Sequence, residues 1–79
     1  MMRMYEFMSA SGNVVTLDLE KVCWAKTNYP KNTLMVHFGK FSEDLSVECV
    51  DFPTAQALVD DISKRKEAYH ASFENKLGE

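Results

Sequence analysis

The side chains best suited to chemistry in this chain are two thiols, Cys23 and Cys49, and one imidazole, His37. A thiolate–imidazole pair acts as a nucleophile only when the two groups are in contact and a third group orients them. The alternation of apolar and polar residues argues against contact, because it places Cys49 on an inward face and His37 on an outward face. We therefore expect both cysteines to be reduced and to serve in packing, and we expect no catalytic residues.

Other patterns typical of enzymes and cofactor sites do not occur in the sequence. The 3 glycines are isolated, so neither a phosphate-binding loop nor a dinucleotide fingerprint is present. No spacing of cysteine, histidine or aspartate residues matches a metal site. Asp60 and Asp61 are adjacent, and adjacent residues do not face each other on a helix. The sequence therefore predicts a protein with no cofactor, no metal and no small-molecule substrate.

One basic cluster stands out, the run Lys64-Arg65-Lys66. On a helix these three side chains spread over about 200° of the circumference, so they do not form a single recognition surface. Asp60, Asp61 and Glu67 lie close enough in sequence to pair with them. A solvated, salt-bridged helix face is the simpler interpretation, and a patch that contacts phosphates is the alternative.

The overall charge narrows the range of partners. The 79 residues carry a net charge of −3, which argues against a general nucleic-acid binder, because such proteins neutralise phosphates. No stretch approaches the roughly 18 apolar residues that a membrane span needs. The first residues do not have the features of a signal peptide. We therefore expect a cytoplasmic protein with no membrane association.

The pattern of the chain predicts the elements that position these groups. Apolar and polar residues alternate over residues 4–8, 15–19, 22–27, 34–38 and 45–49, which is typical of half-buried strands. Turn-forming residues separate them at 9–13, 29–32 and 39–44. The sequence therefore predicts one small two-layer α+β domain over residues 1–79. An antiparallel sheet of four to five short strands, about residues 4–50, is followed by one long C-terminal helix, about residues 52–77, packed on one face of the sheet.

The start and the inward face of this helix are marked clearly. Asp51 is suited to cap the first turn, and Pro53 fits a position where no amide bond is lost. An apolar stripe follows at helical spacing, and Gly78 ends the pattern. The members of the stripe are Ala55, Leu58, Val59 and Ile62. Such a helix would be about 37 Å long, whereas the strands would be about 17–20 Å long, so its distal half is expected to extend past the sheet.

A second apolar stripe, Tyr69, Phe73 and Leu77, lies in this distal half. Three explanations compete: the helix breaks and folds back, its end frays, or the stripe packs on another molecule, most simply a second copy. We favour the last, and expect these three residues to form an interface. The leading hypothesis is thus a non-enzymatic protein-interaction module, a homodimer that serves as an adaptor, a subunit of a complex or a small inhibitor.

The sequence also supports an alternative, a protein associated with nucleic acid. Trp24 alternates with Val22, which predicts that the indole lies in the core. If the outer sheet face instead carried Trp24 and Tyr29 beside lysines, it could stack bases as single-strand binders do. The candidate nucleic-acid contacts are Lys26, Lys31, Lys64, Arg65 and Lys66.

Overall fold

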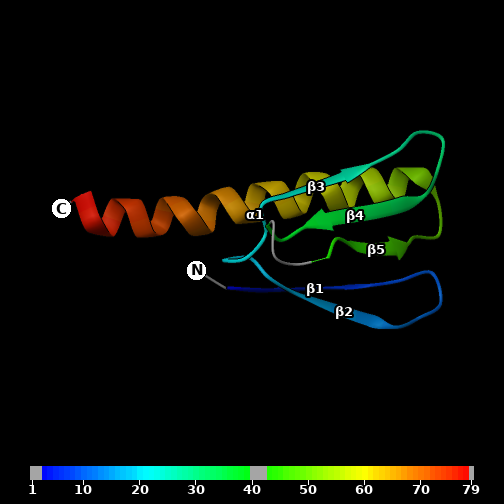
Figure 1. Ribbon diagram of the computed structural model, residues 1–79, viewed down its shortest axis with the longest axis horizontal. Helices are drawn as coiled ribbons and strands as arrows, with labels where there is room; N and C mark the ends of the chain where they lie inside the picture. Colours follow the sequence, from blue (N-terminus) through cyan, green and yellow to red (C-terminus); the bar gives the residue numbers. More distant parts are fainter. Residues whose placement is uncertain (1–2, 40–42, 79) are drawn as a thin grey trace.

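The chain folds into short strands followed by one long helix (Figure 1). The structure, a computed structural model, describes residues 3–39 and 43–78, with side chains described up to residue 72. Within these residues the strands are β1 (Met4–Met8), β2 (Val14–Asp18), β3 (Trp24–Thr27), β4 (Thr33–His37) and β5 (Leu45–Glu48), and the helix is α1 (Phe52–Gly78).

The strands pair as antiparallel hairpins, and the predicted α+β architecture with one helix packed on the sheet is confirmed. β1 pairs with β2, and β4 lies between β3 and β5. The strands form two sheets, of two and three strands, rather than one. The division falls at residues 19–23, where the chain turns and the Lys21 amide donates to the Asp18 carbonyl at 2.9 Å. Within the described residues β2 and β3 are consecutive in the chain but belong to different sheets.

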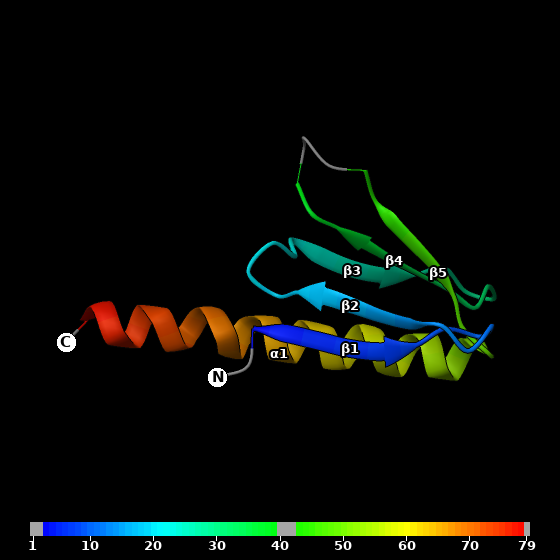
Figure 2. The ribbon, with the colours of Figure 1, turned by 90° about the horizontal axis from the view of Figure 1, so that it is seen from below.

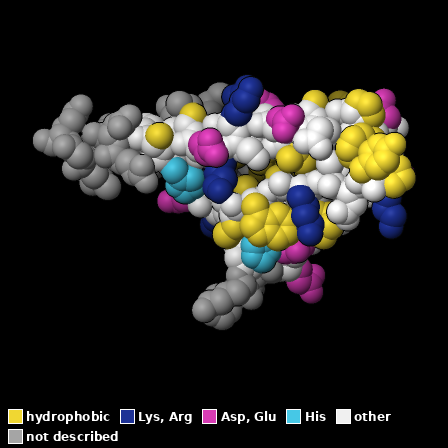
Figure 3. Space-filling model, turned by 90° about the horizontal axis from the view of Figure 1, so that it is seen from above, with side chains coloured by type: hydrophobic (Ala, Val, Ile, Leu, Met, Phe, Trp, Pro, Cys, Tyr) yellow, Lys and Arg dark blue, Asp and Glu magenta, His cyan; other side chains and the backbone are white. Residues whose placement is uncertain are grey.

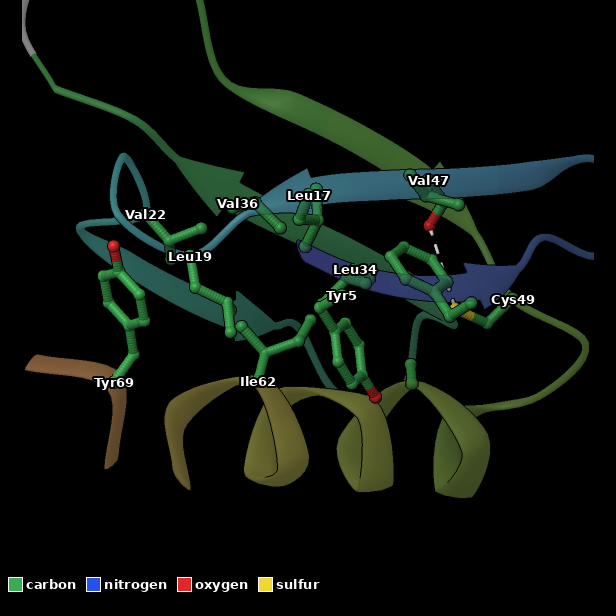
Figure 4. Packing of buried hydrophobic residues seen from close by; sticks show 12 residues of the cluster. Tyr5, Leu17, Leu19, Val22, Leu34, Val36, Val47, Cys49, Ile62 and Tyr69 are labelled. Atoms are coloured by element: carbon green, nitrogen blue, oxygen red, sulfur yellow. Dashed lines mark hydrogen bonds between the residues drawn. The ribbon is translucent and has the colours of Figure 1, made fainter. Parts of the chain in front are cut away.

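The hydrophobic core lies between the two sheets and the helix (Figures 2 and 4). Alternate residues of β1, β2 and β4 point inward, as the period of two requires. Cys49 lies in this core as expected, and burial raises the pKa of its thiol. The buried members are Tyr5, Phe7, Leu17, Leu19, Val22, Leu34, Val36, Val47, Cys49, Ala55, Ile62 and Tyr69.

The helix begins as the sequence predicts. Asp51 caps it, because its Oδ1 accepts a hydrogen bond from the Thr54 amide at 2.8 Å. Hydrogen bonds from Thr54 hold the pKa of the Asp51 carboxyl below its ordinary value. Ala55 and Ile62 are fully buried, which confirms the inward stripe.

The helix continues without a break through the basic cluster. Its 27 residues correspond to about 40 Å, and the molecule's longest dimension is 43 Å. The last turns extend past the strands (Figures 1 and 2). Lys66 links α1 to the residue before β3, because its Nζ donates to the Cys23 carbonyl at 2.5 Å. Its hydrocarbon stem can cover apolar surface while the ammonium binds oxygen.

Tyr69 departs from the sequence-based expectation. The distal stripe predicts an exposed interface residue, but Tyr69 is only 6% exposed within its own chain. Its side chain points from α1 toward Val22 (Figure 4), because the turn at residues 19–23 lies over this part of the helix. The side chains of Phe73 and Leu77 lie outside the described residues, so an interface role for these two stays a prediction.

Candidate interaction surface

An exposed surface lies on the outer face of the β3–β4 hairpin. Trp24 is opposite His37 in the ladder, and Lys26 is opposite Met35. The intervening residues turn inward, where Ala25 packs against the core and Val36 is fully buried. Hydrophobic, basic and histidine side chains consequently lie side by side on the surface (Figure 3).

Trp24 is held in place on this face by its neighbours. Its indole stacks on the His37 imidazole, with ring centroids 4.8 Å apart and planes at 16°. The Lys26 ammonium lies 5.0 Å from the indole centroid, a cation–π contact. His37 is itself fixed, because its Nδ1 lies 2.6 Å from Asp44 Oδ1. The indole is thus oriented in advance of any partner, while 40% of the residue remains accessible to solvent.

The prediction that Trp24 lies in the core is wrong. Val22 is buried as expected, but it belongs to the turn before β3, and Cys23 and Trp24 are both exposed. The ladder starts where the Cys23 amide donates to the His37 carbonyl at 2.7 Å. From this point the pairing with β4 decides the direction of each side chain. Alternation therefore cannot be counted from Val22 through the turn into the strand.

The turn that follows β3 adds a second exposed aromatic residue. Tyr29 is 81% exposed and contacts the Phe52 ring edge-on, with centroids 5.1 Å apart. Lys31 is exposed two residues later. The grouping considered from the sequence, Trp24 and Tyr29 with Lys26 and Lys31, is therefore carried by one hairpin, with the first aromatic residue at its open end and the second at its turn.

The basic cluster of the helix contributes one residue to this surface. Lys66 reaches the carbonyl of Cys23, directly before Trp24. Arg65 turns to a different side of the helix, where its guanidinium pairs with Asp61 at 3.3 Å and lies 5.5 Å from the Tyr5 ring centroid. Lys64 is exposed. The fan-like spread of the cluster and its pairing with Asp61 are confirmed.

The thiols and the imidazole are not brought together as a reactive pair. The described partners of the His37 ring are Trp24 and Asp44. Both cysteines are free thiols, and Cys49 is buried. Cys23 is exposed, so the prediction that both cysteines serve in packing is wrong for Cys23. Within residues 3–39 and 43–72 no three metal-ligating side chains gather into a group that could hold an ion.

One polar contact between distant parts of the chain was not predicted. The Tyr5 hydroxyl donates to Asp61 Oδ2 at 2.6 Å and joins β1 to α1. Burial and this hydrogen bond raise the pKa of Tyr5 to about 12. The hydrogen bond from Tyr5 and the neighbouring Arg65 lower the pKa of Asp61. The two partners are 56 residues apart in sequence, so no local pattern could have indicated the pair.

Comparisons with known proteins place no relative beside this chain: no protein-family model, curated protein or solved structure matches it. In the described part of the chain, no helix combines the length and the apolar character that crossing a bilayer requires.

Proposed function

We propose that this chain is a non-enzymatic protein-interaction module and that it binds a protein partner through the outer face of β3 and β4. The observation that carries the proposal is the exposed Trp24, fixed between His37 and Lys26. Tryptophan and tyrosine are enriched among the residues that contribute most to binding at protein interfaces. A side chain already held in one orientation loses little conformational entropy when a partner covers it.

The neighbours of Trp24 suit it to the centre of such an interface. Met35 lies beside it on β4 and is half-buried, so it adds adaptable apolar surface. Tyr29 supplies a second aromatic anchor at the end of the same hairpin. Lysine and carboxylate groups surround these apolar groups, which matches the polar rim of a typical interface.

Self-association is part of the proposal, and the distal helix is its second surface. The last turns of α1 extend beyond the strands (Figure 1), and the sequence places Phe73 and Leu77 there. Because Tyr69 is buried in its own chain, a homodimer would depend on the other two residues. Sedimentation equilibrium on the wild type and on Phe73→Asp tests this point: a dimer that becomes a monomer supports it, and a monomeric wild type removes it.

A second function, association with nucleic acid, is favoured by one specific observation. Trp24 and Lys26 share the outer face, and aromatic rings beside cations are the elements of single-strand binding sites. Binding of this kind would weaken steeply with added salt. The net charge of −3 opposes it, so we rank it below a protein partner.

Site-specific photocrosslinking in cells distinguishes these functions. A photoreactive phenylalanine analogue placed at Met35 lies on the proposed surface, and the same analogue at Glu6 lies on the exposed side of β1. We expect a discrete protein adduct from Met35 that is not formed from Glu6 and that Trp24→Ala diminishes. Nuclease-sensitive adducts would favour the nucleic-acid function, and equal labelling from both positions would contradict the proposed surface.

A further inference from the structure

Positive charges and aromatic rings follow one another along β3 and the turn after it, next to one lysine of α1. This series starts where Lys66 of α1 reaches the Cys23 carbonyl, continues along β3, and ends at the β3–β4 turn. Its members, called the β3 strip below, are Lys66, Trp24, Lys26, Tyr29 and Lys31. Cationic and hydrophobic side chains gather on the face that Figure 3 shows.

Lys26 and Lys31 of the strip are available for a partner, unlike the arginines of the molecule and unlike Lys66, which binds the Cys23 carbonyl. Arg3 binds Asp18 and Glu20, each at 2.8 Å, and Arg65 binds Asp61. Among the described residues, no carboxylate lies within 4.0 Å of the ammonium of Lys26 or Lys31. The ammonium of Lys26 instead rests over the indole.

One carboxylate beside the outer face, Asp44, is also engaged. It is bound to His37, the ring on which Trp24 stacks. Asp44 is therefore bound to a residue of β4, whereas the charged group over the indole on β3 is the ammonium of Lys26. A chain with a net charge of −3 thus presents, among its described residues, two lysines without a carboxylate partner, Lys26 and Lys31, on the same hairpin as two exposed aromatic rings. Complementary charge across an interface steers encounter and selects partners.

We propose that the β3 strip binds an acidic segment of a partner protein that also carries apolar or aromatic side chains. This inference rests on the proposed function, since it names the chemistry of the protein that the module would bind. Carboxylates of the segment pair with Lys26 and Lys31, and an apolar side chain packs against Trp24. A protein segment suits the strip better than a nucleic acid does, because it needs only a few carboxylates, whereas a polynucleotide brings a phosphate at every residue toward a negatively charged molecule.

Fluorescence titration tests the inference, since Trp24 is the only tryptophan in the chain. The probe is a synthetic peptide with a repeated Asp-Phe-Glu-Leu sequence. The comparison ligands are a peptide with lysine in place of both acidic residues and a thymidine oligonucleotide. We expect the acidic peptide to change Trp24 emission saturably, with an affinity that falls as salt is added, because salt screens exposed charges.

Charge-reversed variants locate the site. Lys26→Glu should lower the affinity for the acidic peptide by about tenfold or more, because an attraction becomes a repulsion. Lys64→Glu is the matched control, since Lys64 is an exposed lysine about 200° around the helix from Lys66. Circular dichroism checks that both variants fold. If both variants lose the same affinity for the acidic peptide, the loss comes from the change in net charge, and the assignment of the site is wrong.

The remaining outcomes are also decisive. If the oligonucleotide binds more tightly than the acidic peptide, the ligand of the strip is a nucleic acid and the proposal is wrong. If the basic peptide binds as tightly as the acidic one, charge does not select the ligand. If no peptide binds while Met35 still crosslinks to a protein, the acidic partner is wrong and the proposed function stands. If the crosslink from Met35 is also absent, the proposed function fails with it.

Discussion

Replacement of Tyr69 by alanine should destabilise the isolated chain, because this ring belongs to its own core. A buried aromatic side chain removes about 150–250 Å² from water, and only 6% of Tyr69 remains exposed. At about 25 cal/mol per Å² this burial is worth about 4–6 kcal/mol. Alanine keeps part of the contact and is the better helix former by about 0.5 kcal/mol. We therefore expect Tyr69→Ala to lower the free energy of unfolding by about 3–4 kcal/mol.

Such a loss is large for a chain of this size, since 79 residues correspond to a total stability of about 4–12 kcal/mol. The assay is urea unfolding, followed by far-ultraviolet circular dichroism at several protein concentrations. The exposed Glu67, two residues before Tyr69 on the same helix, provides the control: Glu67→Ala should change stability by less than about 0.5 kcal/mol.

The result that would refute the reasoning is a small loss, below about 1 kcal/mol, at concentrations where the wild type is monomeric. A loss that appears only as the protein concentration rises would assign Tyr69 to an interface between copies, because the stability of a dimer depends on concentration. That outcome would restore the interface role that the spacing of the distal stripe predicts.

Three further predictions follow from the structure. Because 40% of Trp24 is exposed, its emission should lie at long wavelength and an aqueous quencher such as acrylamide should reduce it in the native state. Cys23 is exposed and Cys49 is buried with a raised pKa, so a thiol reagent should modify Cys23 rapidly and Cys49 only after unfolding. The neutral phenol of Tyr5, bound to Asp61, has a pKa of about 12 against an ordinary 10. The stability it contributes is complete below pH 10 and is lost as the pH rises toward 12, so urea unfolding over this range should show a shallower decline for Tyr5→Phe than for the wild type.

Each of these predictions has an outcome that contradicts it. Emission at short wavelength that resists quenching would place Trp24 in the core. Equal reaction rates of the two thiols in the native state would mean that Cys49 is accessible. Parallel curves of stability against pH for the wild type and Tyr5→Phe would show that folding does not change the pKa of this phenol.

Local patterns in the sequence were sufficient for the secondary structure. Alternation over residues 4–8 and 34–38 predicts β1 and β4 within one residue, because the two faces of a strand meet different surroundings at every second residue. The cap at Asp51 and the stripe through Ile62 predict where α1 begins and which side it buries. Each of these signals involves residues that are close together in the sequence, so it can be recognised without knowledge of the tertiary contacts.

Contacts between distant segments decided the rest. Trp24 faces outward because β3 takes its register from His37 and not from Val22. Tyr69 is buried because the turn at residues 19–23 covers it (Figure 4). Lys66 belongs to the basic cluster that the sequence placed on a solvated helix face, but it binds the Cys23 carbonyl, 43 residues away in the sequence.

The candidate surface illustrates the difference most clearly. Its residue types, Trp24, Tyr29 and the lysines, could be named from the sequence, but their exposure and their common location could not. A period of two assigns side chains to faces within one strand; it does not determine which residue is the first to join the ladder. Hydrogen bonding to a partner strand fixes that residue, and here it places on the exposed face an indole that was predicted for the core.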